Sequence, residues 1–170
     1  DERTLALFRI LLSRHLARPG PEHFHYGDPQ GGLALRQAIA AYLRQARGVR
    51  CDARAVVVTT GTQQGLDLVI RTALSPGDGV LIEDPCYPSA RAAFEGAGMR
   101  LSGLAVDGEG ADIAGAAAGA RAVYVTPSHQ FPLGVTMTMP RRLALLDWAR
   151  ATGGWIVEVD YDSEFRYAGP

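Results

Sequence analysis

Four short segments of the sequence hold residue types that can bind or react with a ligand, and each of them follows a short apolar run. They are residues 59–65, 83–88, 126–134 and 158–164. In the first segment, Gly61, Thr62 and Gln63 open a helical pattern, so backbone N–H groups, a hydroxyl and an amide can hold a phosphate there. The alternative interpretation is a glycine turn in which Thr62 caps the helix.

The second and third segments offer an aromatic ring, a thiol and an imidazole. Tyr87 lies in a proline-rich bend, where its ring can stack on a planar ligand or pack as an ordinary core tyrosine. Cys86 has no histidine or lysine nearby in the sequence, which does not favour a nucleophilic role. His129 follows Ser128, but adjacency in sequence does not make a catalytic pair, so a hydrogen-bonding role in the scaffold is favoured.

The fourth segment is acidic and follows an apolar run that reads as a buried strand. Its carboxylates belong to Glu158, Asp160, Asp162 and Glu164. Such a group can ligate Mg²⁺, present one carboxylate to a protonated ring nitrogen, or form a solvated acidic loop. His23 and His25 lack a third ligand nearby, so we expect no metal site there.

Alternating hydrophobic patterns predict the elements that position these segments. Helices are expected over residues 3–17, 33–47, 62–74, 87–96 and 140–151, with a weak helix over 113–119. Strands are expected over residues 55–60, 80–82, 99–104, 122–125 and 155–159. This alternation predicts a three-layer α/β fold with a mainly parallel sheet and little room for hairpins. In such sheets the ligand site lies at the carboxyl ends of the strands.

The composition is that of an ordinary α/β protein and excludes several classes. Of the 170 residues, 47% are hydrophobic and 21% charged, and the net charge is −1, which argues against a nucleic-acid platform. No apolar run approaches the roughly 20 residues of a membrane span. Two cysteines and the lack of a signal-peptide pattern predict a cytoplasmic protein. All seventeen basic residues are arginine, so no side chain can form a Schiff base.

Taken together, the segments resemble the large domain of fold type I enzymes that use pyridoxal 5′-phosphate (PLP), the aspartate aminotransferase superfamily. They are most similar to the aminotransferase-like effector domain of MocR-type transcriptional regulators of the GntR family. The resemblance covers nearly the whole chain from Tyr26 onward. The matching segments are residues 26–31 with Leu35 and Arg36, 61–64, 83–88, 126–134 and 160–167. We therefore expect an N-terminal helix and connection over residues 1–25 and a partial PLP-binding domain over residues 26–170.

The resemblance implies roles for individual residues. Gly61, Thr62 and Gln63 match the phosphate-binding turn, and Tyr87 matches the aromatic residue that stacks on the cofactor ring. Tyr161 matches the tyrosine that hydrogen-bonds the phenolic oxygen of the cofactor. His129 and Gln130 are nearby polar candidates, because Phe131 stands where many aminotransferases have an asparagine.

Two departures from the family pattern matter for function. Val159 stands where the family has the aspartate that holds the pyridine nitrogen, so this contact is lost unless Asp160 replaces it. The family's Schiff-base lysine and its substrate-binding arginine match no position of the sequence. We therefore expect a fragment that is inactive as it stands, with PLP bound weakly or not at all.

Three functions remain open at this point. The first is a fragment of a regulator whose parent senses PLP or a small amine or amino acid, forms a homodimer and binds DNA through an N-terminal domain outside this chain. The second is a fragment of a genuine class I/II aminotransferase. The third is a Mg²⁺-dependent phosphohydrolase that uses Asp160 and Asp162, although such a pair normally belongs to an early strand.

Overall fold

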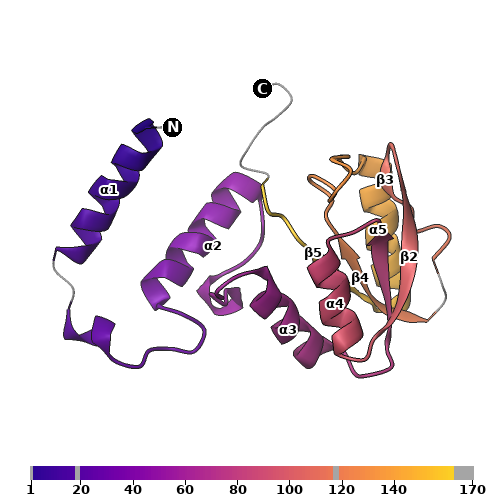
Figure 1. Cartoon of the computed structure of the whole chain (residues 1–170), viewed down its shortest axis with the longest axis horizontal. Helices are drawn as coiled ribbons and strands as arrows, with labels where there is room; N and C mark the ends of the chain where they lie inside the picture. Colours follow the sequence, from indigo (N-terminus) through magenta and orange to yellow (C-terminus); the bar gives the residue numbers. More distant parts are fainter. Residues whose placement is uncertain (1, 18–19, 117–118, 163–170) are drawn as a thin grey trace. The chain divides into compact units, whose positions relative to one another are not determined.

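The chain divides into two compact units in its computed structural model (Figure 1). The structure describes residues 2–17, 20–116 and 119–162. The first unit comprises residues Asp1–Thr59 and the second Thr60–Pro170. The division expected at residues 25 and 26 concerns the organisation of the whole domain and stays a prediction.

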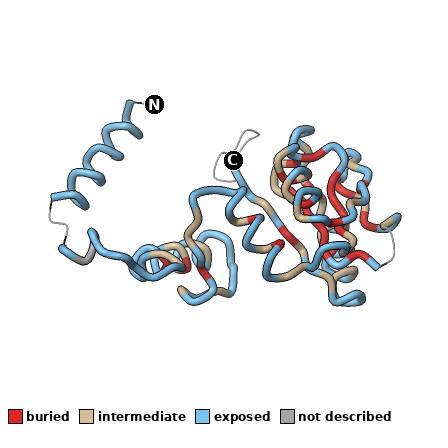
Figure 2. The backbone as a smooth tube through the Cα atoms, turned by 60° about the horizontal axis from the view of Figure 1, so that its bottom comes forward, coloured by how far each residue is buried: buried red, intermediate tan, exposed pale blue. Residues whose placement is uncertain are grey.

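The first unit consists of the two predicted helices and two short 3₁₀ turns. Helix α1 spans Glu2–Leu16 and α2 spans Leu33–Arg47, while the turns η1 and η2 span Pro21–Phe24 and Ala53–Ala55. Gly48 ends α2 in the left-handed conformation at φ 65°, as expected for a glycine at this position. None of the described residues of α1 is buried, and Figure 2 shows this helix exposed along its length.

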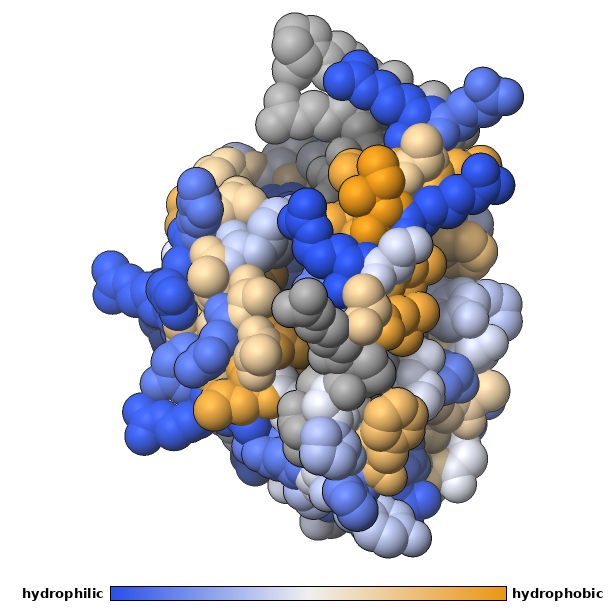
Figure 3. Space-filling model, turned by 90° about the vertical axis from the view of Figure 1, so that its left-hand side faces the viewer, coloured by the Kyte–Doolittle hydropathy of each residue, from blue (hydrophilic) through white to orange (hydrophobic). Residues whose placement is uncertain are grey.

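Helix α1 also exposes much apolar surface. Its large apolar side chains are between 39% and 70% exposed, and they belong to Leu5, Leu7, Phe8, Ile10, Leu11, Leu12 and Leu16. Figure 3 shows apolar side chains reaching the surface between protruding hydrophilic ones. Most of the large apolar side chains of α1 therefore lie at the surface of the first unit.

A buried arginine organises the turn that precedes α2. Arg36 is only 4% exposed and pairs with the carboxylate of Asp28. Its guanidinium also donates to the carbonyls of Gly31 and Ala53, both at 2.8 Å. Gly31 has φ 102°, and a Cβ atom there would lie 2.6 Å from Cγ2 of Val58. The sequence motif of residues 26–36 thus encodes a tight turn and its anchor.

The strand predicted over residues 55–60 was wrong. Ala55 ends the turn η2, and residues 56–60 join no sheet. The Val58 N–H donates to the Gln30 carbonyl at 2.8 Å, and Val57 is 48% exposed. Because β-branched residues favour a strand only where a partner strand and packing are available, propensity alone misled the prediction.

The second unit holds the sheet and three helices. Its helices are α3 (Thr62–Ala73), α4 (Pro88–Gly96) and α5 (Met139–Thr152), and its strands are β1 (Gly79–Asp84), β2 (Arg100–Asp107), β3 (Gly110–Ala111), β4 (Ala120–Val125) and β5 (Trp155–Glu158). The strand order is β3-β2-β1-β4-β5. Strands β2, β1, β4 and β5 run parallel, which confirms the mainly parallel sheet.

Two details of the second unit differ from the prediction. Strands β2 and β3 form a short antiparallel hairpin, with Val106 opposite Ala111. Residues 112–116 form no helix; Ala116 N–H donates to the Ile113 carbonyl in a turn, and residues 117–118 lie outside the described residues. Alanine and glycine in this stretch supply few apolar side chains to bury, so tertiary packing does not stabilise a helix.

The sheet separates two apolar clusters, which confirms the three layers. Val80 and Ile82 of β1 pack with α3 and α4, while Leu81 points to the opposite face and packs with Leu145 of α5. This is the alternation that a strand buried on both faces requires. Figure 2 shows the buried residues gathered in these strands and the helices beside them. Among the described residues, no helix has the length and apolar character that a membrane span needs.

Candidate functional site

The strand order creates a crevice between β1 and β4. The chain leaves β1 toward β2 on one side and returns to β4 on the other, so the loops that follow β1 and β4 diverge at their carboxyl ends. In open α/β sheets, ligands bind at such a switch point. Tyr87 lies in the loop after β1, and Thr126 opens the loop after β4. The sheet topology therefore brings two of the predicted segments together.

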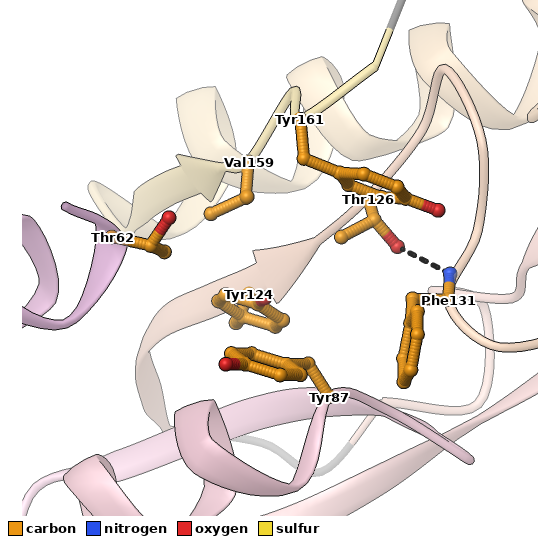
Figure 4. Close-up of a pocket in the computed structure, with 7 residues that line it drawn as sticks. All are labelled: Thr62, Tyr87, Tyr124, Thr126, Phe131, Val159 and Tyr161. Carbon is orange, nitrogen blue, oxygen red and sulfur yellow. Dashed lines mark hydrogen bonds between the residues drawn. The ribbon is translucent and has the colours of Figure 1, made fainter.

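A cavity of about 260 Å³ lies at this point. The described residues that line it come from the start of α3, from β4 and from the loops after β1, β4 and β5: Thr62, Tyr87, Tyr124, Thr126, Phe131, Val159 and Tyr161. In the view of Figure 4, Val159 lies above the cavity and Tyr87 below it, with Thr62 at one end and Phe131 at the other. The walls are mainly aromatic and aliphatic, and hydroxyl groups supply their polar atoms.

Ring contacts fix the aromatic walls relative to one another. The centroids of Tyr87 and Phe131 lie 5.7 Å apart with an interplanar angle of 85°. Phe131 also meets Tyr161 edge to face, at 6.4 Å and 79°. Edge-to-face geometry is a favourable arrangement for aromatic pairs. Tyr87 and Phe131 are each 36% exposed, so both rings remain accessible to a ligand.

A buried carboxylate at the end of β1 accepts hydrogen bonds from the loop that follows β4. Glu83, at the end of β1, is 1% exposed, and its Oε2 atom accepts hydrogen bonds from the Thr126 hydroxyl at 2.6 Å and from the Gln130 amide at 3.2 Å. Burial raises the pKa of the Glu83 carboxyl, and the hydrogen bonds from Thr126 oppose the rise. Gln130 also donates to the Pro85 carbonyl at 2.8 Å, which ties the loop after β4 to the loop after β1.

Of the residues predicted to bind a phosphate, Thr62 lines the cavity and Gln63 does not. Gly61 is the N-cap residue of α3, and no side chain caps this helix, so the interpretation of Thr62 as the cap was wrong. Thr62 lines the cavity at the N-terminus of α3, where backbone N–H groups favour an anion. Gln63 instead donates to the Ser89 carbonyl of α4 at 3.1 Å.

The residues predicted after β4 and β5 lie in different surroundings. Nδ1 of His129 lies 2.6 Å from a carboxylate oxygen of Asp162, and the imidazole stacks on the Tyr161 ring at 5.8 Å. Tyr161 lines the cavity, whereas the exposed residue Asp160 is not among the lining residues, and Val159 occupies the wall instead. Residues 163–167 of the same motif lie outside the described residues.

Sequence reasoning missed Glu83 and Thr126 as the pair that joins the loops, and Tyr124 as part of the wall. The signal for Tyr124 was available, because it alternates with Val123 and Val125 and must face the α3 and α4 side of the sheet. The hydroxyl of Tyr124 is buried and has no hydrogen-bond partner within the described part of the chain. Burial raises its pKa, so the phenol stays protonated.

Neither Cys86 nor the acidic residues near the cavity give support to nucleophilic catalysis by a thiol or to metal-dependent phosphate hydrolysis. Burial raises the pKa of the Cys86 thiol, which disfavours the nucleophilic thiolate. Asp162 contacts His129, and the described residues 2–17, 20–116 and 119–162 hold no group of three His, Cys, Asp or Glu that could bind a metal ion. No observation of the site favours the phosphohydrolase.

The sequence was compared with family profiles and with curated proteins, and both comparisons match nearly the whole chain. The sequence profile of the family "Aminotransferase class I and II" matches residues 11–160. Three curated relatives are the HTH-type transcriptional regulator YdeL of Bacillus subtilis, at 42% identity over 163 residues, the probable rhizopine catabolism regulatory protein MocR of Rhizobium meliloti, at 39% over 160, and the HTH-type pyridoxine biosynthesis transcriptional regulator PdxR of Corynebacterium glutamicum, at 39% over 171. These matches cover 95%, 94% and 99% of this chain but 35%, 32% and 37% of the relatives, so the chain spans about a third of their length.

Solved structures agree with the sequence relatives on the fold. The kynurenine aminotransferase of Pyrococcus horikoshii, solved with PMP, superposes with a TM-score of 0.85 at 30% identity, over 95% of this chain and 42% of that enzyme. The α-aminoadipate aminotransferase LysN of Thermus thermophilus, complexed with N-(5′-phosphopyridoxyl)-L-leucine, gives a TM-score of 0.79 at 30% identity over 93% and 40%. Both structures hold a derivative of pyridoxal phosphate.

Proposed function

Because the chain belongs to the aminotransferase class I and II family, we propose that it is part of the PLP-binding effector domain of a transcriptional regulator. The chain is an aminotransferase-like domain homologous to MocR-type regulators. In our proposal the whole protein senses PLP or a small amine or amino acid, acts as a cytoplasmic homodimer and binds DNA through a separate N-terminal domain.

The single observation that carries the PLP-binding half of this proposal is the cavity at the β1–β4 switch point. Its volume of about 260 Å³ lies just below the usual range for drug-sized ligands and suits a small one. Tyr87 and Val159 lie on opposite sides of the cavity in Figure 4, so a flat ring bound there would have an aromatic wall on one side and an aliphatic wall on the other. The donor set therefore fits the ring and the phosphate of PLP.

Three residues would hold the cofactor. Thr62 and the N-terminus of α3 would bind the phosphate, Tyr87 would contact the face of the ring, and the Tyr161 hydroxyl would hydrogen-bond its phenolic oxygen. PLP, when bound, supplies an aldehyde that reacts with amines and a ring that withdraws electrons. The residues of this chain would bind and orient the ring; with no lysine in the sequence, none of their side chains would hold it covalently.

A titration of the chain with PLP tests the binding half of the proposal. We expect a dissociation constant between high-micromolar and millimolar, equivalent to about 4 to 6 kcal/mol. The helix N-terminus contributes about 0.3–1 kcal/mol for an exposed anion and up to about 2 when it is partly buried. Tyr87→Ala should weaken binding by about 2- to 13-fold, from about 0.5–1.5 kcal/mol of lost aromatic contact. Tyr87→Phe keeps the ring and serves as the control. Equal binding by wild type and Tyr87→Ala in calorimetry would show that the ring site is wrong.

The regulatory half needs the complete gene. Sequencing the DNA that flanks the coding region should reveal a basic winged helix upstream and a Ser-Lys motif downstream. The full-length product should then bind its own promoter in a mobility-shift assay, and PLP should change that binding. A full-length product that binds no promoter DNA would contradict the regulatory part of the proposal and leave only the part on PLP binding.

A genuine aminotransferase is the second candidate, and two observations support it. The aromatic-amino-acid aminotransferase 1 of Thermococcus litoralis is 31% identical over 169 residues, and the structural relatives are aminotransferases. The regulators match at 39% to 42% identity, which favours the first candidate. Transamination by the full-length product without promoter binding would reverse this order.

A further inference from the structure

The cavity at the switch point is built without a charged wall. Of the seven residues that line it within the described part of the chain, three are tyrosines, two are threonines and the others are Phe131 and Val159. The tyrosine that lies deepest, Tyr124, is 1% exposed. None of these side chain types is ionised at neutral pH.

Two ionisable side chains outside the lining, Glu83 and His129, contact lining residues, and each has a hydrogen-bond partner. Oε2 of Glu83 accepts from the hydroxyl of Thr126 and from the amide of Gln130. Asp162 lies against His129, whose ring stacks on Tyr161. Neither Glu83 nor His129 is itself a lining residue. A ligand in the cavity would therefore make no direct contact with the Glu83 carboxylate or the His129 imidazole.

From this lining we infer that the cavity selects an aromatic phosphate ester whose ring carries no charge. A cationic ring would lose water on entry, and none of the described lining residues offers a carboxylate to replace that water. The face of Tyr87 would attract the cation, but a cation–π contact is weaker than the desolvation of an unpaired ion. The Tyr124 hydroxyl, buried and without a partner among the described residues, adds a neutral group to the wall.

This inference rests on the proposed function, since it concerns the same cavity, and it names the class of ligand that the cavity takes. It also gives Val159 a role as a specificity-determining residue. A valine side chain at this wall offers only van der Waals contact to the ring, so it does not stabilise a positive nitrogen. An aspartate at the same position would stabilise it.

Two synthetic probes of the same shape test the inference. The neutral probe is 3-methylbenzyl phosphate, and the cationic probe is its N-methylpyridinium analogue, in which the methylated ring carbon is replaced by a positively charged nitrogen. Calorimetry at neutral pH should show the neutral probe binding wild type at least about tenfold tighter. Val159→Asp should reduce or reverse this preference, and Val159→Asn, equal in size but uncharged, should not. Thermal melts monitored by circular dichroism check that both variants remain folded.

Each outcome bears on one conclusion. Equal or tighter binding of the cationic probe to wild type would overturn the inference while leaving PLP binding intact. A neutral probe that binds no better than inorganic phosphate would overturn it as well. A chain that prefers the neutral probe but does not bind PLP would retain the inference and remove the proposed function.

Discussion

The hydroxyl of Thr126 lies 2.6 Å from Oε2 of Glu83 and donates a hydrogen bond to it. The backbone N–H of Thr126 points to the same oxygen at 3.2 Å. Because Glu83 ends β1 and Thr126 follows β4, this pair joins the two strands that flank the switch point. The N–H of Phe131 donates to the Thr126 hydroxyl at 3.1 Å, so an aromatic wall of the cavity depends on the pair as well.

Removal of this carboxylate should destabilise the fold. Glu83→Ala leaves the hydroxyl and the backbone N–H of Thr126 without their acceptor in a buried site and removes one of the acceptors of the Gln130 amide, so we expect a loss of about 2–4 kcal/mol in the free energy of unfolding. Glu95→Ala, on the exposed side of α4, is the matched control and should change stability by less than about 0.5 kcal/mol. Urea denaturation measures both, and equal effects of the two substitutions would contradict the role of Glu83.

The same carboxyl should make stability depend on pH. Burial raises the pKa of folded Glu83 above its usual value of 4.5, so in the window between these two values the native state binds more proton than the unfolded state. Stability relative to Glu83→Gln should therefore fall as pH rises through that window and then level off. Paired denaturation curves at several pH values test the sign. A relative stability that rises with pH would mean that the hydrogen bonds outweigh burial.

The chain should not form a covalent adduct with PLP on any side chain. Such an adduct requires a lysine amine, and the sequence contains no lysine. After incubation with PLP and reduction with borohydride, intact mass spectrometry should show at most partial labelling, confined to the terminal amine. Transaminase assays of the chain should give no activity above background. A stoichiometric adduct on an internal residue would refute this prediction.

Much of the second unit could be predicted from sequence because its strands are buried on both faces. Runs such as residues 80–82 and 122–125 have no polar face, and the helices between them have clear apolar periods, so pattern alone locates them. Residues 55–58 form a similar apolar run, but residues 55–60 pair with no strand in the described residues. Pairing is a tertiary property, and the composition of a single segment does not contain it.

The candidate site could be predicted only in part, for a similar reason. Thr62, Tyr87 and Tyr161 were expected in the site and line one cavity, because each follows the carboxyl end of a strand or begins a helix. Gln63 was expected there too, but one further step along α3 turns its side chain by about 100° and toward α4. Sequence spacing gives the loop, and the helical rotation decides which side chain enters the cavity.

This difference between neighbouring residues leads to a prediction about phosphate binding. Thr62 lines the cavity, whereas the Gln63 amide is engaged with the Ser89 carbonyl at 3.1 Å. A hydrogen bond from a hydroxyl to a charged phosphate is worth about 1.5–3 kcal/mol, and partial exposure places this one at the lower end. Thr62→Ala should therefore weaken PLP binding about tenfold. Thr62→Ser retains the hydroxyl and should bind within about threefold of wild type, and Gln63→Ala within about twofold.

Pyridoxal, which lacks the phosphate, separates this contact from a general loss of structure. If Thr62 acts on the phosphate, Thr62→Ala and wild type should bind pyridoxal equally weakly, because the remaining ring contacts come from Tyr87 and Tyr161. Calorimetric titrations of the four proteins with both ligands give the comparison. A Gln63→Ala variant that loses as much affinity for PLP as Thr62→Ala would move the phosphate away from the cavity and toward α4, and the assignment of this end of the site would then be wrong.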